Sequence, residues 1–67
     1  MPDDVKAARM TEKERRRWRE INGIAQTGED KAFCRDLERR GFAVCYGTRS
    51  GNWYFHLTTK GEREVYR

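Results

Sequence analysis

The chain lacks long apolar runs and contains few metal-ligating side chains. No stretch approaches the roughly 18 to 20 consecutive apolar residues that a membrane-spanning helix needs, so we expect no membrane contact. The first residues have neither the basic nor the apolar segment of a secretory signal peptide, and we therefore expect a cytoplasmic protein. Two cysteines and one histidine are too few ligands for a structural zinc site in one chain. We expect no metal, no cofactor and no small-molecule ligand.

Signatures of catalysis are also missing. His56 is the only histidine, and on the predicted hairpin described below it lies opposite Cys45. A histidine beside a cysteine can generate a reactive thiolate, but nothing in 67 residues marks an oxyanion hole or a substrate cleft. We expect a non-enzymatic protein in which Cys34 and Cys45 are reduced, partly buried thiols rather than a disulfide.

The length and charge limit what the chain can be. A single domain of 67 residues buries only about 60% of the surface that its unfolded chain exposes, so a dimer or a protein partner would help to stabilise it. The 15 basic residues outnumber the 11 acidic ones, which gives a net charge of +4 that favours polyanions as partners. We assign residues 1–10 to a flexible N-terminal arm and residues 11–67 to one folded domain.

Capping patterns and apolar spacing predict the helices. The predicted segments are an Arg-rich helix that begins after Thr11, a second helix over about Glu29–Arg40, and a short last helix that begins after Thr59. The first helix presents a thin apolar stripe that needs something to pack against, formed by Trp18, Ile21 and Ala25. Gly41 follows the second helix at a position where glycine commonly ends helices.

Two alternating segments over residues 42–58 predict a β-hairpin with its turn at Ser50-Gly51. A two-residue turn places Tyr46 opposite Phe55 and Val44 opposite Leu57 on one apolar face, with Cys45 and His56 on the other. The run Trp53-Tyr54-Phe55 could also form a base-stacking platform of the single-strand-binding type. Alternation, however, directs Trp53 and Phe55 into the core and leaves only Tyr54 outside.

The order of these elements carries a family resemblance. A helix that ends in Leu37-Glu38-Arg39-Arg40-Gly41-Phe42 precedes the hairpin, which is followed by Leu57-Thr58-Thr59-Lys60-Gly61. Over about residues 29–67 this order resembles winged helix-turn-helix regulators of the MarR and PadR type. The resemblance implies an α+β fold: a small winged-helix-like domain of two or three helices plus one antiparallel β-hairpin, the wing. Only residues 23–28 separate the first two helices, so the domain resembles a trimmed member of the phage or bacterial regulator type.

The resemblance also implies a function, which is binding to duplex DNA as a small transcriptional regulator. The recognition helix would span about residues 29–40 and the basic wing residues 42–58. The residues that would contact DNA are Lys31, Arg35, Arg39 and Arg40 on the helix and Arg49 and Asn52 at the wing tip. We add three arginines of the first helix as candidate phosphate contacts, Arg15, Arg16 and Arg19; the alternative is a solvated face paired with neighbouring glutamates.

Two other functions stay open. The apolar stripe of the first helix and Tyr66 would also suit a protein-interaction module, such as a homodimer or a phage-encoded inhibitor of winged-helix-like shape. The order of helix, Gly-Phe, strand, glycine and strand is similar to RNA-cleaving toxins of the HicA type, which have a histidine after the hairpin glycine. Here Thr48 follows Gly47, so RNA binding is the minor alternative. DNA binding requires Arg35, Arg39 and Arg49 on one exposed side, whereas an interaction module requires exposed apolar area there.

Overall fold

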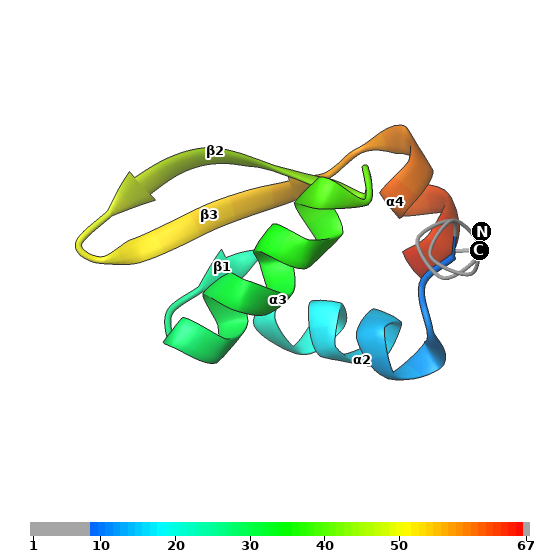
Figure 1. Cartoon of the computed structure of the whole chain (residues 1–67), viewed down its shortest axis with the longest axis horizontal. Coiled ribbons are helices and arrows are strands. Elements are labelled where there is room, and N and C mark those ends of the chain that lie inside the picture. Colours follow the sequence, from blue (N-terminus) through cyan, green and yellow to red (C-terminus); the bar gives the residue numbers. More distant parts are fainter. Residues whose placement is uncertain (1–8, 67) are drawn as a thin grey trace.

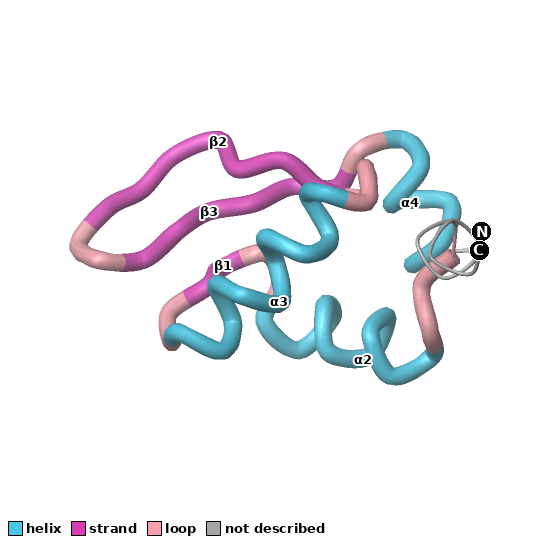
Figure 2. Tube along the Cα trace, in the orientation of Figure 1, coloured by secondary structure: helices cyan, strands magenta, loops and turns pink. Residues whose placement is uncertain are grey.

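The computed structural model describes residues 9–66. Its elements are α2 (Glu12–Ile21), β1 (Ile24–Ala25), α3 (Gly28–Arg39), β2 (Ala43–Arg49), β3 (Asn52–Leu57) and α4 (Thr59–Val65). In these residues three helices and a three-stranded antiparallel sheet form a small α+β domain, with a shape consistent with the winged-helix class. The β2–β3 hairpin projects at the end of the molecule opposite α4, as Figures 1 and 2 show. Of the predicted N-terminal arm, residues 1–8 lie outside the described part.

The start of α2 confirms the predicted capping box. The Thr11 hydroxyl accepts a hydrogen bond from the backbone N–H of Glu14 at 3.1 Å, and the Glu14 carboxylate accepts one from the Thr11 N–H at 2.9 Å. The helix ends at Ile21, where Asn22 adopts the left-handed conformation with φ of 53°. The chain then forms β1, which pairs with β3 and was not predicted. Two residues are too short to show strand alternation.

Helix α3 follows the predicted second helix closely, and α4 begins one residue earlier than predicted. The Thr27 hydroxyl caps α3 by accepting from the N–H of Asp30 at 3.1 Å, and Gly41 follows the helix with φ of +88°. At α4 the capping residue is Thr58 rather than Thr59, because the Thr58 hydroxyl accepts from the N–H of Gly61 at 3.1 Å. The same hydroxyl donates to the Gly41 carbonyl at 2.6 Å, which ties the helix start to the preceding turn.

The hairpin confirms the predicted turn but corrects the predicted register. Arg49 pairs with Asn52 across Ser50-Gly51, as a two-residue turn requires. An irregularity between Cys45 and Gly47 then inserts Tyr46 as an extra residue, and beyond it every pair shifts by one. The observed pairs are Cys45 with Phe55, Val44 with His56 and Ala43 with Leu57. The predicted pairs were therefore wrong, because one inserted residue exchanges the two faces of the strand.

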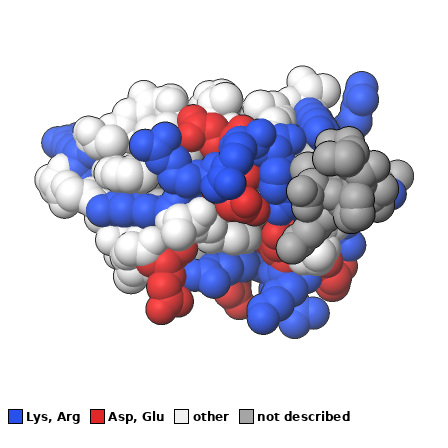
Figure 3. Space-filling view, in the orientation of Figure 1, with Lys and Arg blue, Asp and Glu red and all other residues white. Residues whose placement is uncertain are grey.

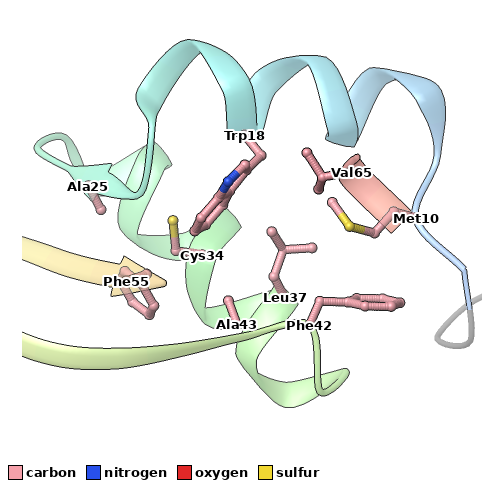
Figure 4. Packing of buried hydrophobic residues seen from close by; sticks show 9 residues of the cluster. All are labelled: Met10, Trp18, Ala25, Cys34, Leu37, Phe42, Ala43, Phe55 and Val65. Carbon is pink, nitrogen blue, oxygen red and sulfur yellow. The ribbon is translucent and has the colours of Figure 1, made fainter. Parts of the chain in front are cut away.

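The core contains the apolar stripe of α2. Trp18 of α2 is buried and Ile21 packs against the core cluster. Ala25 is also buried, but it belongs to β1 and not to the helix, because α2 ends at Ile21. All three residues are covered by the chain's own α3, hairpin and α4. Figure 4 shows Trp18 pointing toward Cys34 of α3, with Leu37 and Phe42 deeper in the same cluster. The expectation that this stripe needs a partner is corrected. Met10 also belongs to the cluster, so the core begins one residue before the predicted domain boundary.

Candidate nucleic-acid interface

Three cations lie on one side of α3. Lys31, Arg35 and Arg39 are spaced four residues apart, which places them in one row along the helix. The Arg39 side chain is 78% exposed and lies 3.9 Å from Asp36, and the exposed Arg35 donates to Glu38 at 3.2 Å. Exposed ion pairs of this kind contribute only about 0 to 1 kcal/mol, so a phosphate can replace the carboxylate at low cost.

Two of these cations meet the hairpin at Trp53. The Lys31 Nζ atom lies 5.1 Å from the centroid of the Trp53 ring, and the Arg35 guanidinium carbon lies 4.9 Å from it. Trp53 is half-buried and pairs with Thr48 of β2 on one side and with Ala25 of β1 on the other. These contacts, each of the cation–π type, join the basic row of α3 to the wing near its tip, one residue pair from the turn.

The hairpin itself carries no negative side chain. Residues 41–61 contain no Asp or Glu, although the whole chain has 11 of them. Ser50 and Gly51 both have positive φ, of 53° and 81°, which is typical of the tight hairpin turn that matches strand twist. The turn presents Arg49 at the exposed tip, opposite the half-buried Asn52. Within residues 9–66 the Arg49 side chain forms no ion pair, so its charge is available to an anion.

Arg40 is held inside the protein instead of facing a ligand. Its side chain is 10% exposed and donates to Glu14 at 2.7 Å and to Asp36 at 2.9 Å. The hydrogen bond to Glu14 raises the pKa of the guanidinium. Burial acts to raise the pKa of the Glu14 carboxyl, but hydrogen bonds from Arg40 and Thr11 outweigh it and lower that pKa. Arg40 therefore connects α3 to α2, and we remove it from the candidate contacts.

The arginines of α2 divide between two environments. Arg15 donates to the Met10 carbonyl at 2.8 Å and to Glu12 at 3.0 Å, and Arg19 donates to the Val65 carbonyl at 3.2 Å. Both side chains therefore lie beside α4, at the end of the molecule opposite the hairpin turn (Figure 1). Arg16 is exposed and lines a shallow hollow with Lys13 and Arg17. The predicted set is thus not one surface: Arg15 connects α2 to Met10, and Arg19 connects it to the end of α4.

Figure 3 shows how charge is distributed over the α3 side of the molecule. Basic and acidic side chains are interspersed over the helices, whereas the half of this face that belongs to the hairpin is mostly uncharged. The one Lys or Arg in residues 42–58 is Arg49.

The candidate interface keeps the α3 row of Lys31, Arg35 and Arg39 and adds Trp53. Arg49 and Asn52 stay candidates at the wing tip, but they form the pair next to Thr48–Trp53 and so lie on the opposite face of the ribbon from Trp53. The expected single exposed side for Arg35, Arg39 and Arg49 is therefore not observed. Sequence alternation assigned Trp53 to the core alone. The four-residue spacing of Lys31 and Arg35 shows that both lie on one face of α3, but no signal in the sequence indicated that this face meets Trp53.

The cysteine and histidine side chains form no dyad. His56 is exposed and pairs with Val44, so the predicted Cys45–His56 pair was wrong. Burial, together with the nearby Asp30 carboxylate, raises the pKa of the Cys34 thiol to about 12. Both cysteines are free. A thiol of such high pKa is a poor nucleophile at neutral pH, because only the thiolate reacts.

The two remaining findings concern membrane-spanning helices and similarity to known proteins. No helix within residues 9–66 is both long enough and apolar enough to cross a membrane. No protein-family model matches the chain, and no curated protein or solved structure matches it. Function is therefore inferred from the chemistry of the α3 row and the hairpin.

Proposed function

We propose that this protein binds duplex DNA through α3 and the β2–β3 wing, as a small non-enzymatic transcriptional regulator in the cytoplasm. The observation that carries the proposal is the convergence of Lys31 and Arg35 on Trp53, close to the tip of a hairpin without acidic residues. This convergence brings the cations of α3 to the end of the wing, where Arg49 is the wing's own cation.

The dimensions of this surface suit a polyanion. From Lys31 to Arg39 the helix rises by about 12 Å, since each residue adds about 1.5 Å. Phosphates along one DNA strand are separated by roughly half that distance, so the row can contact more than one of them, while Arg49 reaches from the wing tip. Each neutralised phosphate should contribute about 0.9 to the slope of log affinity against log salt concentration.

The composition of α3 favours phosphate contact over base readout. Residues 28–39 contain no Ser, Thr, Asn or Gln, the neutral side chains that read base edges. Arginine can read guanine. Arg35 and Arg39, however, are the exposed cations of the row and are therefore equally able to contact phosphates. We infer that the phosphate backbone supplies most of the affinity and that sequence preference is modest.

Salt-dependent binding of charge-removing variants tests the proposal. Arg49→Ala and Arg39→Ala should each lower the salt slope on a random-sequence duplex by about one unit, with similar weakening on every sequence tried. The matched control is Arg63→Ala, which removes the same charge from the exposed surface of α4. Equal slopes for wild type, both interface variants and the control would exclude α3 and the wing from the interface.

The main reason for the protein-interaction alternative no longer applies. That reason was the apolar stripe of α2, which lies in the chain's own core. Tyr66 is exposed as that alternative requires, but it follows α4 and lines a hollow with Phe55 and Leu57 at the base of the wing, not at the tip that carries Arg49. The duplex-binding proposal is therefore the one that the geometry favours.

A further inference from the structure

The hairpin has a second exposed surface, on the face turned away from α3. We call it the outer aromatic face; its members are Ile24, Val44, Tyr46, Tyr54 and His56. The strand pairing defines it, because Ile24 lies opposite Tyr54 and Val44 lies opposite His56, and directly opposed residues share a face. The bulge adds Tyr46 to this face.

On this face the Tyr46 ring lies beside two others, those of His56 and Tyr54. The Tyr46 ring centroid lies 5.3 Å from that of His56 and 6.2 Å from that of Tyr54, with interplanar angles of 45° and 47°. Tyr46 is 64% exposed, and His56 is also exposed. An aromatic ring exposed to this extent contributes little to the core, so the fold does not explain why the bulge presents it.

We propose that the outer aromatic face binds unpaired bases of single-stranded nucleic acid. Every base has a π-face, and exposed Tyr and His rings on a sheet can stack with bases whatever the sequence. Arg49 and Asn52 close the same ribbon at its tip, where Arg49 can contact a backbone phosphate. This activity goes beyond duplex binding, because it uses the other face of the hairpin and needs bases that are not paired.

Charge and composition favour a nucleic-acid strand over a second protein copy. The face belongs to a segment without any Asp or Glu, which suits a polyanion, and two copies facing each other would bring their Arg49 charges together. Its aliphatic part is limited to the half-buried Ile24 and to Val44, which is 36% exposed. The other members are Tyr and His rings, which carry polar atoms. Such rings can stack on bases whose polar edges remain in contact with water.

The test uses fluorescent oligodeoxyuridine DNA and oligouridine RNA of about 12 nucleotides, which carry the same base, form no duplex and span a typical site. Tyr46→Ala should weaken binding of these strands by about tenfold or more, because stacking on one aromatic ring has an effect of this size. Tyr46→Leu keeps apolar volume but removes the ring, and it should weaken binding nearly as much. The matched control is Tyr66→Ala, which removes a tyrosine of equal exposure, 65%, from α4 and should bind as wild type does.

Each outcome has a defined meaning. Loss in both Tyr46 variants with retention in the Tyr66 variant supports the proposal, and the tighter of the DNA and RNA strands identifies the sugar that the site prefers. Equal strand affinity in wild type and Tyr46→Leu would overturn it, as would failure of the wild-type protein to bind either strand. Sedimentation that shows a dimer abolished by Tyr46→Ala, without strand binding, would assign the face to a second copy instead. Far-UV circular dichroism checks that each variant is folded.

Discussion

The backbone N–H of Phe55 donates a hydrogen bond to the carbonyl oxygen of Gly23 at 2.7 Å. This bond fixes the chain that leaves α2 against the middle of β3. Gly23 has φ of +78°, and a Cβ atom there would lie 2.3 Å from the Phe55 carbonyl oxygen. Both conditions exclude a side chain, because L-residues rarely adopt such a φ and the contact is with backbone that cannot rotate away.

Gly23→Ala should therefore destabilise the protein by about 2 to 3 kcal/mol, a large effect for a single methyl group. The measurement is urea unfolding followed by circular dichroism. Gly28→Ala is the matched control, since no atom lies within 4 Å of a Cβ placed there, and it should change the free energy of unfolding by less than about 1 kcal/mol. Equal stability of the two variants would mean that α2 does not approach β3 as described.

The same Leu→Ala substitution can be made at a fully buried position, Leu37, and at a partly buried one, Leu57. Leu37 is fully buried, so Leu37→Ala should cost about 2 to 5 kcal/mol of unfolding free energy. Leu57 is only partly buried at the edge of the cluster, and Leu57→Ala should cost clearly less. Thermal unfolding of both variants measures the difference, and the reverse order would contradict the observed burial of the two side chains.

Arg40 gives a prediction about pH. Arg40→Met should lower stability at neutral pH by about 1 to 3 kcal/mol, because it removes charged hydrogen bonds to Glu14 and Asp36. The folded protein holds the pKa of Glu14 below its ordinary value of 4.5. The resulting stability is fully present above that ordinary value and is lost as the pH falls through the lowered one.

The wild-type protein should consequently lose stability as the pH is lowered from about 5 toward 2, and Arg40→Met should show a smaller loss over that range. Arg39→Met is the control, since its guanidinium is exposed and should change neither the stability nor its pH dependence appreciably. Chemical unfolding at a series of pH values gives both slopes. Identical slopes for Arg40→Met and wild type would refute the role assigned to the Glu14 pair.

The two thiols should differ in reactivity. Cys34 is fully buried with a pKa of about 12, while Cys45 is half-buried. A thiol-specific disulfide reagent at pH 8 should modify Cys34 more slowly than Cys45 by about tenfold or more, because little thiolate forms and the protein must open first. Cys45→Ser should retain only the slow reaction and Cys34→Ser only the fast one. Equal rates in the folded protein would contradict the burial of Cys34.

Much of the fold was predictable because its signals are local. The capping box at Thr11, the stop at Gly41 and the turn at Ser50-Gly51 each depend on a few adjacent residues, and all three were predicted. The register was not, because the bulge at Tyr46 leaves no mark on a pattern of alternating residues. Because Val44 and Tyr46 are apolar, the alternation pattern predicted that both face the core, but both are exposed on the outer face of the hairpin.

The candidate site was predictable only in part. The family resemblance pointed to the row on α3, which lies on the surface, and to Arg49 at the wing tip. It could not separate Arg39 from Arg40, which are adjacent in sequence but differ because only Arg40 reaches Glu14 of α2. Which arginines contact the chain's own carboxylates depends on how the helices pack, and that information lies in no local pattern.

Duplex binding by the wild-type protein tests the central claim most directly. A labelled random-sequence duplex would be titrated with protein at about 50 mM and then about 150 mM salt, with particle size measured in parallel. Three or four phosphate contacts predict micromolar binding at the lower salt that weakens by about 20- to 50-fold at the higher one. Absence of binding at the lower salt, by protein shown to be folded, would contradict the proposal that α3 and the wing bind duplex DNA.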